Sequence, residues 1–192
     1  SGYVSSIGAS VGGLVGNNYT GRNISNSFAA VNVQANNNAG GLAGTQGGGT
    51  IFGSYALGSV SGNSNVGGFT GNWQSGANGS NYFNSATTGQ SNGVGGGLTD
   101  PGVTAAGLQG ASLPSGFSSD DWGAGAGLYP YLKAFHASTP QAISGSSNNL
   151  SGVATGNYRV AAYAQGKVLG LGLVRSFANG TYYLLAPAGS VT

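Results

Sequence analysis

The sequence predicts an all-β protein built around a β-solenoid, in which short coils of chain stack on one another. A glycine-rich motif returns every 27 to 28 residues, and apolar residues alternate with polar ones over short runs. The composition agrees, because 40 of the 192 residues are glycine and only 4% are charged. Ordering so much glycine is costly in entropy, and regular backbone hydrogen-bond ladders offset that cost best.

A glycine pair followed by an apolar residue marks each coil. The motif occurs four times, the fourth time in shortened form, and it begins at Val11, Ala39, Val66 and Val94. A period this short suits one coil of a solenoid and is too short for an independent domain. The glycine pairs are expected where the backbone bends or packs too closely for a Cβ atom. We therefore assign residues 1–98 to β-solenoid repeats.

Large apolar residues keep the same spacing as the glycine pairs. From this spacing we expect two columns of side chains inside the solenoid, formed by Leu14, Leu42 and Phe69 and by Phe28, Tyr55 and Tyr82. Polar tracts such as residues 34–38 and 62–65 are expected to form the corners. Asparagine and glycine suit such corners because they tolerate left-handed backbone conformations.

Beyond residue 98 the repeat stops and the composition changes. Residues 99–140 are rich in leucine and aromatic residues, and we expect them to form a cap that covers the last coil. Residues 141–192 are expected to form a small β-sandwich-like module. Two hairpins are predicted in this module: residues 158–164 with 167–169 across Gln165-Gly166, and residues 174–177 with 181–185 across Asn179-Gly180.

The repeat resembles a known family. Gly-Gly-Leu-Val-Gly, an asparagine followed by isoleucine, and Asn-Ser-Phe-Ala before the next glycine pair are similar to the GLUG repeat of large bacterial surface proteins, the filamentous-haemagglutinin-like adhesins. The resemblance covers roughly residues 1–98, and the third unit departs from the pattern at Tyr82 and Phe83. It implies a secreted protein at the bacterial cell surface.

Titratable chemistry is scarce in this chain. His136 is the only histidine, and it has no Gly-X-Ser-X-Gly motif beside it, as a serine nucleophile would require. Asp120 and Asp121 are adjacent, so in a strand they would face opposite sides and could not flank a sugar. The repeats contain no aspartate for calcium, and no basic patch is present for nucleic acid. We therefore predict no enzymatic activity, no cofactor, no metal and no nucleic-acid partner.

Any ligand contact is expected from exposed aromatic and polar side chains. Trp73 lies in a polar corner, where it either packs against the cap or is offered to a partner. A carbohydrate site is one interpretation of Asp120, Asp121 and Trp122, because the motif places hydrogen-bond acceptors beside an aromatic face. The other interpretation is a helix cap or a turn. These four residues are the candidate contact residues.

A structural role agrees best with the sequence. We expect a non-enzymatic, adhesive segment of a secreted bacterial surface protein, which displays an extended β stalk for attachment. The alternative is a self-assembling extracellular fibre subunit that stacks through open solenoid ends, and a third possibility is a glycan-binding or polysaccharide-acting β-helix module. The expected partners are a host or abiotic surface, a glycan, or neighbouring copies. No apolar run approaches the length of a membrane span, so we expect no membrane insertion of this segment.

Overall fold

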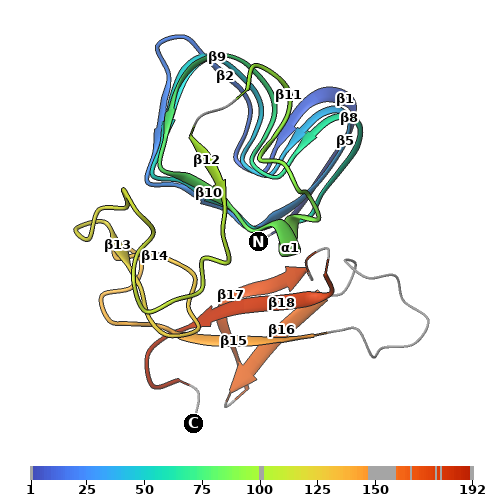
Figure 1. Ribbon diagram of the computed structural model, residues 1–192. Helices are drawn as coiled ribbons and strands as arrows, with labels where there is room; N and C mark the ends of the chain where they lie inside the picture. Colours follow the sequence, from blue (N-terminus) through green and yellow to red (C-terminus); the bar gives the residue numbers. More distant parts are fainter. Residues whose placement is uncertain are drawn as a thin grey trace.

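The computed structural model describes residues 2–99, 102–146, 159–164, 166–175, 177 and 179–190. It is nearly all β, with 57% of residues in strands and 2% in helix. Figure 1 looks along a solenoid whose coils overlay one another from blue to green. The yellow segment and the orange-to-red strands lie beside the solenoid. The predicted fold class is therefore confirmed.

Three parallel sheets form the faces of the solenoid. The first has the order β1 (Gly2–Gly12), β5 (Val31–Gly40), β8 (Val60–Gly67). The second has the order β11 (Val94–Gly97), β9 (Thr70–Gly79), β6 (Ala43–Phe52), β2 (Val15–Tyr19), with β3 (Asn23–Ser25) also paired to β6. The third has the order β12 (Val103–Ala105), β10 (Asn81–Phe83), β7 (Tyr55–Ala56), β4 (Phe28–Ala29).

The pairing register reproduces the sequence period. Val33 lies beside Val60, and Phe28 beside Tyr55, each pair separated by one repeat. The solenoid makes about four turns, one more than the three complete repeats suggest. Asn81 pairs with Val103, so parallel pairing continues past the predicted boundary at residue 98 as far as Ala105.

The fourth glycine motif is out of register with the other three. The motif predicts that Val94 pairs with Val66, but Val94 pairs with Thr70. The Phe69 N–H donates to the Gly93 carbonyl, just as the Leu42 N–H donates to Phe69. Gly93 therefore takes the place that a leucine or phenylalanine holds in the other coils.

The first predicted column lies in the solenoid interior where the coils cover it. Leu42 and Phe69 are fully buried in one cluster with Ile51, Ala56 and Phe83. Their counterpart Leu14 is 50% exposed because it belongs to the first coil, which has no coil stacked before it in this structure. Strict alternation along the short strands decides which side chains point inward.

The second predicted column faces the opposite way. Tyr55 belongs to a separate cluster with Trp122 and Phe117, and Phe28 and Tyr82 pack against the same cluster. The neighbouring alanine, Ala56, points into the solenoid instead. The spacing was correct, but the aromatic column lies on the outer face.

Close approach between coils explains the glycine pairs. A Cβ on Gly41 would overlap the Gly68 carbonyl and lie 2.8 Å from the Ala56 Cβ. At the polar corners, Asn38 and Asn65 both have φ of 51°, as predicted for these tracts. The Asn65 Nδ2 donates to Asn38 Oδ1 at 2.8 Å, so the corner amides form a ladder of their own.

The cap contains β13 (Trp122–Gly123) and β14 (Tyr131–Leu132), which pair antiparallel. The cap was expected to cover the last coil. It packs instead along the side of the coils, against Phe28, Tyr55 and Tyr82. The last coil instead carries a single helical turn, α1 (Ser85–Thr88), in which the Ala86 and Thr87 N–H groups donate to Asn84 Oδ1.

The last part of the described chain contains β15 (Gln141–Ser146), β16 (Arg159–Ala164), β17 (Lys167–Arg175) and β18 (Thr181–Ala186). The first predicted hairpin is confirmed for its described residues, since β16 pairs antiparallel with β17. Tyr158 and Gln165 lie outside the described residues. The second hairpin is wrong as a strand pair: the turn closes between Phe177 and Thr181, but β18 pairs with β15.

Candidate interaction surfaces

An aromatic layer joins the cap to the side of the solenoid. Phe28 and Tyr55 stack with ring centroids 5.2 Å apart, and Phe117 and Trp122 meet at 4.9 Å. The Tyr55 hydroxyl donates to the Pro130 carbonyl at 2.6 Å. Burial raises the pKa of Tyr55 well above its usual value, so this donor keeps its proton. The layer fixes the cap in place.

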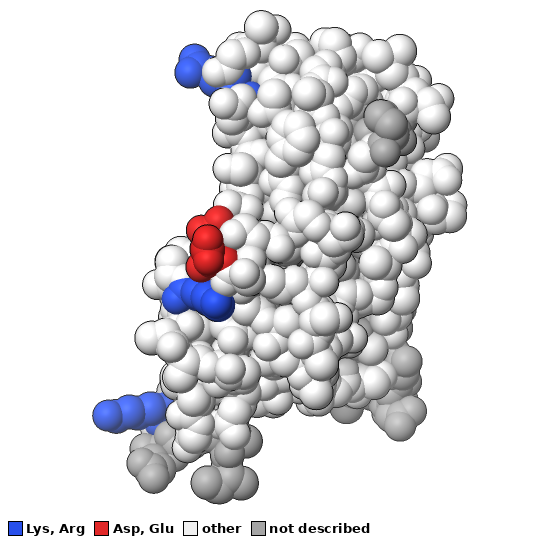
Figure 2. All heavy atoms as spheres, turned by 60° about the vertical axis from the view of Figure 1, so that its left-hand side comes forward, with Lys and Arg blue, Asp and Glu red and all other residues white. Residues whose placement is uncertain are grey.

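Asn26 connects Trp122 and Asp121 to the solenoid. The Trp122 Nε1–H donates to Asn26 Oδ1 at 3.3 Å, and Asn26 Nδ2 donates to Asp121 Oδ2 at 2.7 Å. Trp122 is completely buried, so its ring faces offer no platform for a sugar. Asp120 and Asp121 are exposed and lie in the turn that precedes Trp122. Of the two alternatives given for this motif, a sugar site or a turn, the structure has the turn. The red atoms in Figure 2 mark this pair on a surface with few charges.

Trp73 is only 3% exposed and is not a surface contact. It lies beside Gln46 in the sheet register, and Gln46 lies beside Asn18. Both polar side chains are buried, and Asn18 Nδ2 donates to Gln46 Oε1 at 2.8 Å. The sequence analysis placed these residues in a polar corner. In the structure they form a buried column across three coils, in which Trp73 follows Asn18 and Gln46. It is buried, and it is not part of the aromatic cluster that holds the cap.

A cleft of about 500 Å³ lies between α1, the cap and the strands β15 and β18. Its polar lining is uncharged and includes Asn84, Gln109 and Asn179. Tyr129 and Tyr183 meet edge to face at 4.8 Å, and the Tyr129 N–H donates to the Tyr183 hydroxyl. Burial raises the pKa of Tyr129 and raises that of Tyr183 to about 12, so both phenols stay neutral. Sequence reasoning did not find this cleft because its residues come from three separate segments.

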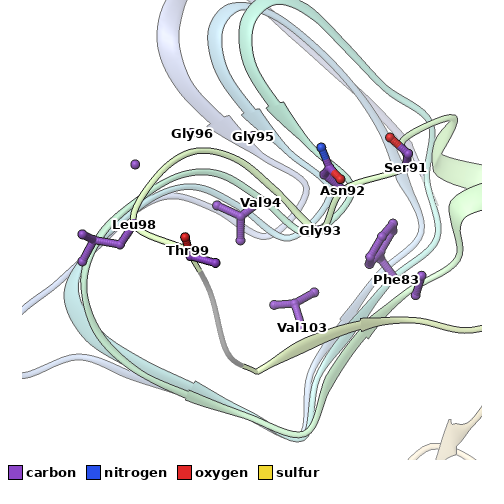
Figure 3. Close-up of a pocket in the computed structure, with 12 residues that line it drawn as sticks. Phe83, Ser91, Asn92, Gly93, Val94, Gly95, Gly96, Leu98, Thr99 and Val103 are labelled. Atoms are coloured by element: carbon purple, nitrogen blue, oxygen red, sulfur yellow. The ribbon is translucent and has the colours of Figure 1, made fainter.

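The C-terminal end of the solenoid is open. A cavity of about 450 Å³ lies within the last coil. Figure 3 shows Phe83, Val94 and Val103 at its wall. The cavity lies where Gly93 replaces the large apolar residue of the other coils. None of the side chains that line it is titratable. The sequence signal for this opening was the shortened fourth motif.

No described cluster has the composition of a metal or acid–base site. Among the described residues no group of three or more histidine, aspartate, glutamate or cysteine side chains is close enough to hold a metal ion. His136 packs edge-on against Tyr131, with ring centroids 5.9 Å apart. In the same part of the chain, no helix is long and apolar enough to cross a membrane.

Comparison with known proteins gives no match. Neither a family model, nor a curated protein, nor a solved structure is similar to the chain. The surfaces described above therefore have to be interpreted from their own chemistry.

Proposed function

We propose that this chain is a non-enzymatic structural segment, a β-solenoid stalk, of a secreted bacterial surface protein that takes part in attachment. The observation that carries the proposal is the set of parallel ladders that join successive coils, braced along their side by the aromatic layer. Such ladders make a stiff rod, because the first three coils are hydrogen-bonded to one another along three faces and the last coil is bonded along two. The resemblance of the repeat to the GLUG pattern supports the bacterial surface location.

The titratable groups support a role without catalysis. Asp121 accepts a hydrogen bond from Asn26 in the cap junction, and His136 packs on Tyr131. Acid–base catalysis needs convergent groups around one substrate atom. In the described residues these side chains are engaged in packing and docking instead.

Glycan binding is a second candidate, and the uncharged cleft beside α1 favours it. Amides and tyrosine hydroxyls suit the hydroxyl groups of a neutral sugar, whereas the buried Trp73 and Trp122 do not contribute. The Asn84 Nδ2 already donates to the Tyr129 hydroxyl, which holds one wall of the cleft in place.

An attachment assay tests the main proposal. Beads coated with the chain should bind to cultured cells or glass more than beads coated with albumin. Replacing His136 with Asn, and Asp100, Asp120 and Asp121 with Asn, should leave attachment within a few fold, since no step depends on their ionisation. Attachment no better than albumin would refute the adhesive role. Loss of an enzymatic activity in the quadruple variant, with the circular dichroism spectrum unchanged, would refute the non-enzymatic one.

A further inference from the structure

The uncharged cleft beside α1 contains two tyrosine hydroxyls whose protons have no acceptor within the described chain. Tyr129 Oη accepts from Asn84 Nδ2 at 3.2 Å, and Tyr183 Oη accepts from the Tyr129 N–H at 3.2 Å. No described residue accepts a hydrogen bond from either hydroxyl. Tyr129 is only 5% exposed, and a buried donor without an acceptor is costly. Both side chains line the cleft, so a ligand can supply the missing acceptors.

The amide oxygens of two other lining residues are already occupied. Asn84 Oδ1 accepts from the Ala86 and Thr87 N–H groups. Asn179 Oδ1 accepts from both the N–H and the hydroxyl of Thr181. The Nδ2 group of Asn179 remains as a donor on an exposed side chain. The cleft therefore offers more donors than acceptors, and a ligand that fits it must bring acceptors.

One acceptor remains on the cap side of the cleft. Gln109 Nε2 donates to the Gly127 carbonyl at 3.1 Å, and no described residue donates to Gln109 Oε1. A planar acetamido group points its carbonyl and its N–H in opposite directions, and so can meet donors and an acceptor on different walls. A sugar hydroxyl carries its donor and its acceptors on one oxygen and cannot reach both.

Surface for the rest of an acetamido sugar lies in the same cleft. Ala86 is exposed and offers a methyl group against which an acetyl methyl can pack. Tyr182 lies across Gly145 of the paired strand, where a Cβ would be 2.7 Å from the Cζ atom of the tyrosine ring. The half-buried ring of Tyr182 can stack on the apolar face of a sugar ring. No lining residue is charged, which favours a neutral ligand.

A peptide fits this arrangement less well than a sugar. Peptides that add to a sheet bind through donors and acceptors that alternate along a strand edge. Here the donors are side chains gathered in one cleft of about 500 Å³, which is a typical size for a small-ligand site.

We propose that the cleft binds neutral glycans that contain N-acetylhexosamine and that it recognises their acetamido group. The hydroxyls of Tyr129 and Tyr183 donate to the acetamido carbonyl, and Gln109 accepts from the acetamido N–H. This inference rests on the glycan-binding candidate given above and adds the ligand class and the groups that select it.

Two disaccharides test the ligand class. Di-N-acetylchitobiose and cellobiose have the same β-linked rings and differ only where an acetamido group replaces a hydroxyl. In an NMR titration of the whole isotope-labelled chain, di-N-acetylchitobiose should bind at least about tenfold more tightly than cellobiose. Equal affinities would overturn the acetamido inference and leave glycan binding standing. Binding of neither sugar would refute both. Tighter binding of N-acetyl-alanyl-alanine amide than of either sugar would make the site a peptide site and overturn the proposal.

Removing one hydroxyl tests the contact itself. Tyr129→Phe should raise the dissociation constant of di-N-acetylchitobiose at least about tenfold, because one donor to the carbonyl is lost. Tyr131→Phe is the matched control, since its hydroxyl bonds to Thr139 and does not line the cleft. It should leave the dissociation constant unchanged.

Asn179→Asp is a second variant, at an exposed position where folding is not at risk. It replaces an amide donor with a carboxylate and should also weaken binding of di-N-acetylchitobiose. Unchanged affinity in both Tyr129→Phe and Asn179→Asp, or an equal loss in Tyr131→Phe, would overturn the proposal. Attachment to glass, which carries no glycan, tests the stalk proposal separately.

Discussion

Replacing Leu42 with alanine tests whether stacked coils share one core. Leu42 is fully buried in the interior column, with Leu14 before it and Phe69 after it. The substitution removes three carbon atoms, each contributing about 0.8 kcal/mol of burial, or about 2.4 kcal/mol in total. Neighbouring coils hold the hole open, so a cavity cost is added and the total falls within about 2–5 kcal/mol.

Leu14→Ala is the matched control, because it makes the same change in the same column. Leu14 is half exposed, so only about half of the transfer free energy is lost, about 1 kcal/mol, and no closed cavity forms. In thermal unfolding followed by circular dichroism, Leu42→Ala should lower Tm by roughly 4–20 °C and Leu14→Ala by roughly 2–4 °C. Equal shifts, or no shift for Leu42→Ala, would refute the shared interior column.

Three further predictions concern the cap, the coil spacing and the pH dependence. Asn26→Ala should lower the free energy of unfolding by about 1–3 kcal/mol in urea titration, because Asp121 and the Trp122 N–H both lose a partner. Gly41→Ala should cost at least about 2 kcal/mol through overlap with the next coil, whereas Gly107→Ala, with open space around it, should stay within about 0.5 kcal/mol. The stability contributed by Tyr183 should be fully present below pH 10 and fall between pH 10 and 12, since the pKa of Tyr183 is raised from 10.0 to about 12 and the unfolded chain releases this proton first. A Tm that rises over that interval would contradict the last prediction.

The solenoid could be predicted from sequence because its repeated constraints are local. Gly40 and Gly41 lie where the next coil approaches too closely for any side chain, and the same clash recurs at each complete repeat. Asn38 and Asn65 mark the corners because their left-handed backbone is rarely adopted by other side chains. Strong steric requirements repeated at one spacing leave a clear pattern in the sequence.

The last coil could not be predicted from the same pattern. Val94-Gly-Gly matches the earlier motifs in letters, yet it aligns four residues later in the sheet register, with Thr70. The chain between β10 and β11 contains α1 and no strand of the first sheet, which shortens this coil. In a glycine-rich sequence a chance glycine pair cannot be told from a required one. The carbonyl of Gly93, which accepts from the Phe69 N–H, identifies the true equivalent.

Two of the four candidate contact residues are buried, for a different reason. The sequence left open whether Trp73 packs or is offered to a partner and whether Trp122 faces a sugar, and in the structure Trp73 continues a buried column of amides while Trp122 docks the cap. Low charge removes the usual contrast between the inside and the outside of a protein. Without that contrast, polarity along this sequence indicates corners and does not indicate exposure.

The position of the cap follows from the orientation of the aromatic column. Alternation in β7 gives two faces, one with Tyr55 and one with Ala56, and spacing alone does not say which is inside. The interior position holds Ala56 and, in the next coil, Phe83, and Ala56 lies so close to Gly41 that a Cβ on this glycine would be 2.8 Å from the alanine methyl group. The tyrosines must then face outward, where each coil adds one more ring to an apolar strip. Exposure of this strip to water would be unfavourable. A segment rich in tryptophan, phenylalanine and tyrosine covers most area by lying along that strip. The cap therefore braces the side of the rod.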